Sequence, residues 1–238
     1  MKRLITLSLS LAALVALSGA PAALAETPHY EGAKVCMKCH DLQGESWEKT
    51  VHAKAFESLK PSMKAEAKQK AGLDPAKDYT KDGECLACHT TGFGKPGGYA
   101  VDMPAAQAKP LAAVTCESCH GAGSQFRQEH GNAENRLKRQ SEHTDRSVIV
   151  QAGQNFDYQT ACASCHLNYH GSPWANAAPP YTPFTPAVDP KYAFDFDKAV
   201  RKSGKGTGVH DHYKLIGVFK GEAPLLRTEF QVDAKEPE

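Results

Sequence analysis

All eight cysteines of this 238-residue chain fall into four C-x-x-C-H units. Two thiols spaced this way on a helical turn can each form a thioether with one of the two vinyl groups of a porphyrin, and the following histidine can bind the iron. The pattern predicts four covalently attached haem c groups. The attachment cysteines are Cys36, Cys39, Cys85, Cys88, Cys116, Cys119, Cys162 and Cys165, and the proximal histidines are His40, His89, His120 and His166.

The histidine that ends each unit separates haem attachment from other cysteine chemistry. A C-x-x-C pair alone also fits a zinc site, a disulfide or a redox dithiol. With only 11 histidines in the chain, one directly after each of four such pairs is not expected by chance. We therefore favour haem over zinc, and no cysteine remains for a disulfide or a catalytic thiol.

The amino terminus has the pattern of a cleaved export signal. A cationic Met1-Lys2-Arg3 precedes an apolar run from Leu4 to Leu17, and Ala23-Leu24-Ala25 is a small-x-small cleavage site. The sequence thus predicts a signal peptide over residues 1–25 and a periplasmic mature chain, 26–238, with no membrane span. The near-neutral net charge of the mature chain argues against a nucleic-acid partner, because binding nucleic acid needs excess positive charge on the protein.

The four haems must share one body. The mature chain has roughly fifty residues per haem, too few to enclose each haem in a domain of its own. We expect a single tetrahaem cytochrome c domain of mainly α class, compact, with extended proline-rich loops and little or no sheet. Haems packed this closely indicate electron transfer.

Several segments are expected to position the haems. Apolar residues recur at helical spacing from Gly44 to Leu59. A second helix is expected to carry Phe126 and His130 and to end at Gly131-Asn132. A last helix is expected from Asp195 to Lys202, and Tyr213 to Phe219 has mild strand character.

Seven further histidines are candidates for the second axial position. His52 and His130 are good candidates because each shares an apolar helical face with a phenylalanine, and one member of the His210/His212 pair is another. The remaining three, His29, His143 and His170, are poor candidates. The residues alone therefore suggest about three distal ligands for four haems.

The mature chain closely resembles the cytochrome c-554 family, the tetrahaem electron carriers of ammonia-oxidising bacteria. The resemblance covers nearly all of it and includes idiosyncratic stretches. Among them are Ser46-Trp47, His52-Ala53-Lys54-Ala55, Cys116-Glu117-Ser118-Cys119-His120-Gly121, Pro180-Tyr181-Thr182-Pro183-Phe184-Thr185-Pro186 and His212-Tyr213-Lys214-Leu215.

The resemblance implies a specific ligand scheme. It pairs His40 with His130 at haem 1, His120 with His210 at haem 3, and His166 with His52 at haem 4. Haem 2, on His89, is left five-coordinate, with Thr182, Pro183 and Phe184 over its open face. Haems 1 and 3, and haems 2 and 4, are expected to stack.

The resemblance also implies a function. The chain is expected to be a carrier rather than an enzyme, accepting electrons from hydroxylamine oxidoreductase and passing them to a small or membrane-bound c-type cytochrome. An alternative is a reductase of nitric oxide or another small nitrogen oxide at haem 2, and a storage or structural haem protein explains less. The near-neutral charge departs from the basic family carrier.

Overall fold

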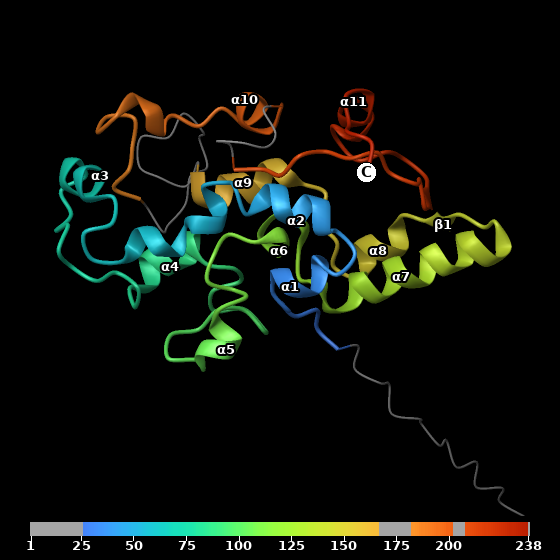
Figure 1. The fold of residues 1–238 in the computed structure, drawn as a ribbon, viewed down its shortest axis with the longest axis horizontal. Coiled ribbons are helices and arrows are strands. Elements are labelled where there is room, and N and C mark those ends of the chain that lie inside the picture. Colours follow the sequence, from blue (N-terminus) through green and yellow to red (C-terminus); the bar gives the residue numbers. More distant parts are fainter. Residues whose placement is uncertain (1–25, 167–181, 202–207, 238) are drawn as a thin grey trace, which may run out of the picture.

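The computed structural model describes residues 26–166, 182–201 and 208–237 (Figure 1). These residues are mainly helical and contain one small two-stranded sheet, which confirms the predicted fold class. None of the described helices is long and apolar enough to cross a membrane. The elements in chain order are α1 (Ala33–Cys36), α2 (Asp41–Trp47), η1 (His52–Lys54), η2 (Phe56–Leu59), α3 (Ala65–Lys70), α4 (Gly83–His89), α5 (Ala105–Ala108), α6 (Cys116–His120), α7 (Gly123–Gln140), β1 (Thr144–Asp145), α8 (Ser147–Gln151), α9 (Tyr158–His166), η3 (Pro190–Tyr192), α10 (Phe196–Arg201), β2 (Phe219–Lys220) and α11 (Arg227–Val232).

Each C-x-x-C-H unit forms one turn of helix. Helices α4, α6 and α9 all end at the histidine of their unit. In the first unit α1 ends at Cys36, and the amides of Cys39 and His40 still donate to the Cys36 carbonyl at 3.2 and 3.0 Å. The turn therefore places the thiols and the imidazole of each unit on one local scaffold.

The four attachment helices form a continuous series of contacts. Helix α1 packs against α6, α6 packs against α9, and α9 packs against α4. Figure 1 shows α6 and α9 in the middle of the body, with α3 towards one end and α7 towards the other. The four C-x-x-C-H units are consequently neighbours in the order 1, 3, 4, 2.

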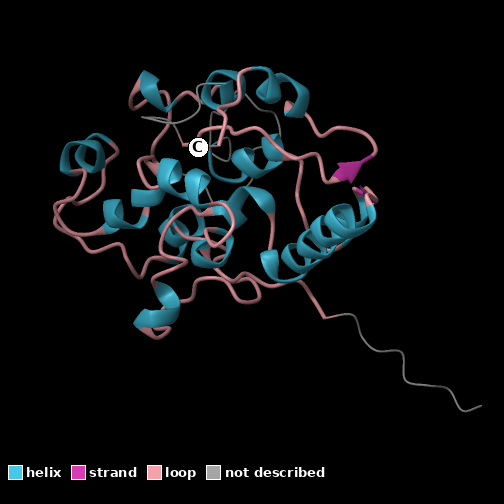
Figure 2. Ribbon diagram, turned by 45° about the vertical axis from the view of Figure 1, so that its right-hand side comes forward, coloured by secondary structure: helices cyan, strands magenta, loops and turns pink. Residues whose placement is uncertain are grey.

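The carboxy-terminal segment returns to the helical hairpin of α7 and α8. Strand β2 pairs in parallel with β1, with Thr144 opposite Phe219 (Figure 2). The amide of Asp211 donates to Ser46 Oγ in α2 at 2.9 Å. These contacts fix the segment that carries His210 and His212.

An apolar cluster lies beside the second attachment helix. Its buried members are Leu59, Tyr79, Leu86, Tyr99 and Leu111. Leu86 is one of the two variable residues of the Cys85–His89 unit and is completely buried. The cluster thus anchors α4 from within its own motif.

The stretch 44–59 is not the continuous helix that its spacing predicted. Helix α2 ends at Trp47, and two 3₁₀ turns follow. The His52 carbonyl accepts the Val114 amide at 3.2 Å, and the Ala55 carbonyl accepts from His89 Nδ1 at 2.7 Å. Tertiary partners therefore take carbonyls that an α-helix would use internally.

Two other boundaries also differ from expectation. Helix α7 continues through Gly131-Asn132 and ends only before Ser141, which is left-handed at φ 58°. Ala133, just past the expected end, is fully buried, so packing outweighs the local glycine signal. The expected strand is confined to Phe219–Lys220, with a single bridge between Tyr213 and Lys235. Helix α10 lies within the range 195–202 that was expected for the last helix, but α11 follows it and was not predicted from the sequence.

Candidate haem sites

Three pairs of histidines that are distant in sequence face one another in the fold. The ring centroids of His40 and His130 lie 6.1 Å apart. Those of His120 and His210 lie 6.3 Å apart, and those of His52 and His166 lie 5.8 Å apart. In each pair one residue follows a C-x-x-C unit and the other comes from a different part of the chain.

These separations leave room for one metal ion between the two rings. Metal–imidazole bonds are about 2 Å long, so two imidazoles on opposite sides of one ion have centroids about 6 Å apart. All three pairs have this spacing, whereas rings in direct contact would be free to approach closer. The residues therefore fit bis-histidine iron ligation.

Hydrogen bonds orient several of these rings for ligation through Nε2. Nδ1 of His52 lies 2.6 Å from the carbonyl of Gly208, and Nδ1 of His210 lies 2.6 Å from that of Asp211. A carbonyl only accepts, so Nδ1 carries the proton and Nε2 keeps its lone pair for a metal. A Cβ at Gly208 would collide with the His52 ring, so this approach requires glycine.

His89 differs from the other three proximal histidines. Its Nδ1 donates to the Ala55 carbonyl at 2.7 Å and lies 3.0 Å from Ser58 Oγ. In the described part of the chain, no ring contact joins His89 to a second imidazole. The ring is thus oriented like a metal ligand but faces no partner histidine there.

Two side chains of the third unit lie deep in the fold. Burial lowers the pKa of His120 to about 3 and raises the pKa of Cys119 to about 12. A position away from solvent is expected for residues that hold a bulky prosthetic group.

The attachment thiols approach one another in two pairs. A hydrogen bond between Cys36 and Cys116 is the main cause that raises the pKa of Cys36. A hydrogen bond with Cys165 likewise raises the pKa of Cys88 more than any other cause. The first and third units are therefore adjacent, as are the second and fourth.

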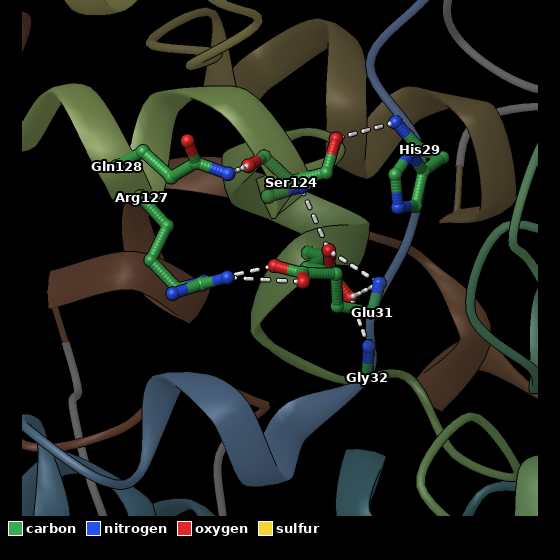
Figure 3. A network of polar contacts seen from close by, with 8 residues as sticks. His29, Glu31, Gly32, Ser124, Arg127 and Gln128 are labelled. Carbon is green, nitrogen blue, oxygen red and sulfur yellow. Dashed lines mark hydrogen bonds and ion pairs between the residues drawn. The ribbon is translucent and has the colours of Figure 1, made fainter.

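A buried carboxylate joins the first unit to the third. Glu117, a variable residue of the Cys116–His120 unit, is 1% exposed. Its oxygens accept the amides of Glu31 at 3.0 Å, Gly32 at 2.6 Å and Gly123 at 2.7 Å. Figure 3 shows the surrounding contacts, including the ion pair between Arg127 and Glu31. The network fixes the segment before α1 against α6.

The structure places the remaining predicted residues as follows. Phe184 is half-buried, with its ring 5.3 Å from that of Tyr192, and the Phe184 amide donates to Thr182 Oγ1 at 3.2 Å. His29 does not lie in a loose terminus, because its amide donates to Ser124 Oγ at 2.9 Å and its carbonyl accepts the Ser124 amide at 3.2 Å. The signal segment, His170 and Pro180-Tyr181 lie outside the described residues.

Four C-x-x-C-H turns in one helical body, with imidazoles spaced for iron, are typical of a multihaem c-type cytochrome. A family model described as "Cytochrome c554 and c-prime" matches residues 35–121. The chain is 48% identical over 237 residues to cytochrome c-554 of Nitrosomonas europaea, covering 99% of this chain and 97% of that protein. The solved structure of the reduced state of cytochrome c554 from that organism matches with a TM-score of 0.81 and 49% identity, over 88% of this chain and 98% of that one. The chain belongs to the cytochrome c-554 family, as its motifs predicted.

Family membership establishes the general function of the chain. The chain is a multihaem c-type electron carrier that binds haem c covalently. Sequence reasoning did not single out Glu117, Ser58 or the carbonyl of Ala55, although these groups hold two of the units in place. Variable positions inside a motif and backbone carbonyls leave no recognisable signal in one sequence.

Proposed function

We propose that this chain is a periplasmic carrier with four covalent haems that accepts electrons from hydroxylamine oxidoreductase and passes them to a small or membrane-bound c-type cytochrome. The observation that carries the proposal is the set of three imidazole pairs, 5.8 to 6.3 Å apart, together with a fourth proximal histidine that has no such partner among the described residues. The export signal supports the periplasmic location.

The protein contributes ligation, orientation and proximity. When bound, the haems supply one-electron chemistry at iron. In this proposal the Nε2 atoms of His40, His130, His120, His210, His166 and His52 hold three irons from both sides, and His89 holds the fourth from one side. An iron bound by two strong nitrogen ligands changes its ligation little when it is oxidised or reduced. This kind of ligation favours electron transfer over substrate binding. The packed series α1, α6, α9, α4 keeps the attached groups close together.

The proposal is tested by timing reduction of the oxidised protein by hydroxylamine oxidoreductase during hydroxylamine turnover. We expect rapid reduction that continues when a small c-type cytochrome is added as acceptor. Full reduction by dithionite without reduction by hydroxylamine oxidoreductase would contradict the proposed donor. The role as an electron carrier would then still stand.

His89, which faces no second imidazole among the described residues, also favours a second candidate function, reduction of nitric oxide at haem 2. Steady-state consumption of nitric oxide by the reduced protein separates the two functions. Consumption that stops after one equivalent supports the carrier, whereas sustained consumption as fast as electron uptake from the donor supports the reductase.

A further inference from the structure

Lys68 is a buried cation without a carboxylate partner. Its side chain lies in α3 and the residue is 4% exposed, although lysine is almost never fully buried unless it is paired. Among the ion pairs of the described residues, none includes Lys68. Its Nζ instead donates to the Lys60 carbonyl at 2.7 Å and lies 5.2 Å from the centroid of the Tyr79 ring.

Both of these partners belong to segments packed on the second haem-attachment helix. Tyr79 shares the buried cluster with Leu86, and Cys85 packs against the same cluster. Lys60 directly follows η2, which contacts α4 and contains Ser58, a neighbour of His89 Nδ1. The ammonium group is therefore held beside the Cys85–His89 unit by two independent contacts.

The low exposure of Lys68 limits the screening of its charge by water. Burial lowers the pKa of Lys68, while the charge of Asp78 opposes that shift. Asp78 is exposed, so solvent screens its interaction with Lys68. A charge in a low-dielectric interior acts more strongly on its neighbours than the same charge at the surface.

We infer that Lys68 is a fixed positive charge that raises the reduction potential of the haem carried by Cys85 and Cys88. One-electron reduction adds a negative charge at that iron, and a nearby unscreened cation stabilises the reduced state. The inference rests on the proposed haem at these cysteines. A raised reduction potential favours this haem, on the last helix of the series α1, α6, α9, α4, as the one that the first electron reduces.

Potentiometric titration of the holoprotein, followed through the high-spin ferric signal, tests the inference. Lys68→Met removes the charge and keeps an unbranched apolar side chain, while Lys68→Gln removes the charge but retains a donor for the Lys60 carbonyl. We expect each to lower the equilibrium constant for reduction of this haem about tenfold, which corresponds to 59 mV for one electron. Lys68→Arg retains the charge and should stay within twofold of the wild type.

Lys81 provides an exposed control. Its side chain is 74% exposed and its Nζ is paired with Asp102 at 3.0 Å. Solvent and the paired carboxylate screen its charge, so Lys81→Met should change the equilibrium constant less than twofold. The other three haems, titrated in the same samples, should also keep their potentials.

Three results would overturn the inference. They are an unchanged potential in both neutral variants, an equal fall in Lys68→Arg, or an equal shift at all four haems. If Lys68→Met fails to accumulate with haem, Lys68→Gln decides. A wild-type protein without a high-spin haem would instead contradict the proposed ligation at His89, and the role of Lys68 would then be decided by whether one haem alone shifts.

Discussion

His120 and His210 face one another with their ring centroids 6.3 Å apart and their planes 26° from parallel. His212, two residues further along, stacks on Phe230 with centroids 4.0 Å apart and planes 12° from parallel. The segment is fixed by the bond from the Asp211 amide to Ser46 Oγ. The local backbone therefore presents only one of the two neighbouring histidines to His120.

The first prediction concerns this choice. His210→Ala should convert one low-spin haem to high-spin, because His120 loses the imidazole opposite it. His212→Ala should leave the spin states unchanged, although it removes the stacking on Phe230 and the edge contact with the His210 ring, whose centroid lies 5.5 Å away. Electron paramagnetic resonance of both oxidised variants measures this directly. Conversion by His212→Ala, with none by His210→Ala, would reverse the assignment.

The second prediction concerns the buried carboxylate of Glu117. Glu117→Ala leaves three amides without acceptors, and each unsatisfied buried donor costs about 1–3 kcal/mol, so the free energy of unfolding should fall by about 3 kcal/mol or more. Denaturant unfolding of the holoprotein gives this value. The exposed Glu48 provides the control, and Glu48→Ala should cost less than about 0.5 kcal/mol. Equal small losses in both variants would show that the network contributes little to stability.

The third prediction concerns Phe184. If Thr182, Pro183 and Phe184 close the open face of haem 2, the reduced wild-type protein should bind carbon monoxide poorly. Phe184→Ala should strengthen binding, because truncating a packed phenyl ring leaves a cavity that a diatomic can enter. Carbon monoxide titration followed by absorbance tests this, with Phe230→Ala as a control distant from His89 in the proposed scheme. Strong binding by the wild type, unchanged in Phe184→Ala, would contradict the role of this segment.

The motifs predict the attachment sites, and the resemblance over longer stretches identified the family, which the comparisons confirm. A thioether-forming pair of cysteines followed by histidine is a local pattern, and a local pattern can be recognised without knowledge of the fold. The helical class also followed, since several segments have apolar residues at helical spacing and the resemblance implies a mostly helical fold.

The local pattern was less reliable where tertiary contacts compete with it. The carbonyls of His52 and Ala55 bond to Val114 and His89, so the expected helix there is replaced by 3₁₀ turns. Helix α7 passes through Gly131 because Ala133 packs in the interior. Neither competing partner is visible from spacing within the segment itself.

The residues that support the haem sites could not be predicted from the sequence, for a different reason. Glu117 and Lys68 look like ordinary charged residues in polar segments, and only the fold shows that they are buried. Charge in a sequence usually indicates a solvated surface. The exceptions depend on contacts between segments that are distant along the chain, such as Glu117 with Glu31 and Gly32.

The central claim is that one polypeptide holds three bis-histidine haems and one haem with an open axial position. Quantitative electron paramagnetic resonance of the fully oxidised protein, with spins integrated against protein concentration, tests this most directly. The account predicts four ferric spins per chain, three low-spin and one high-spin. Fewer than four spins would contradict the four attachment sites, and four low-spin signals would contradict the open position at His89.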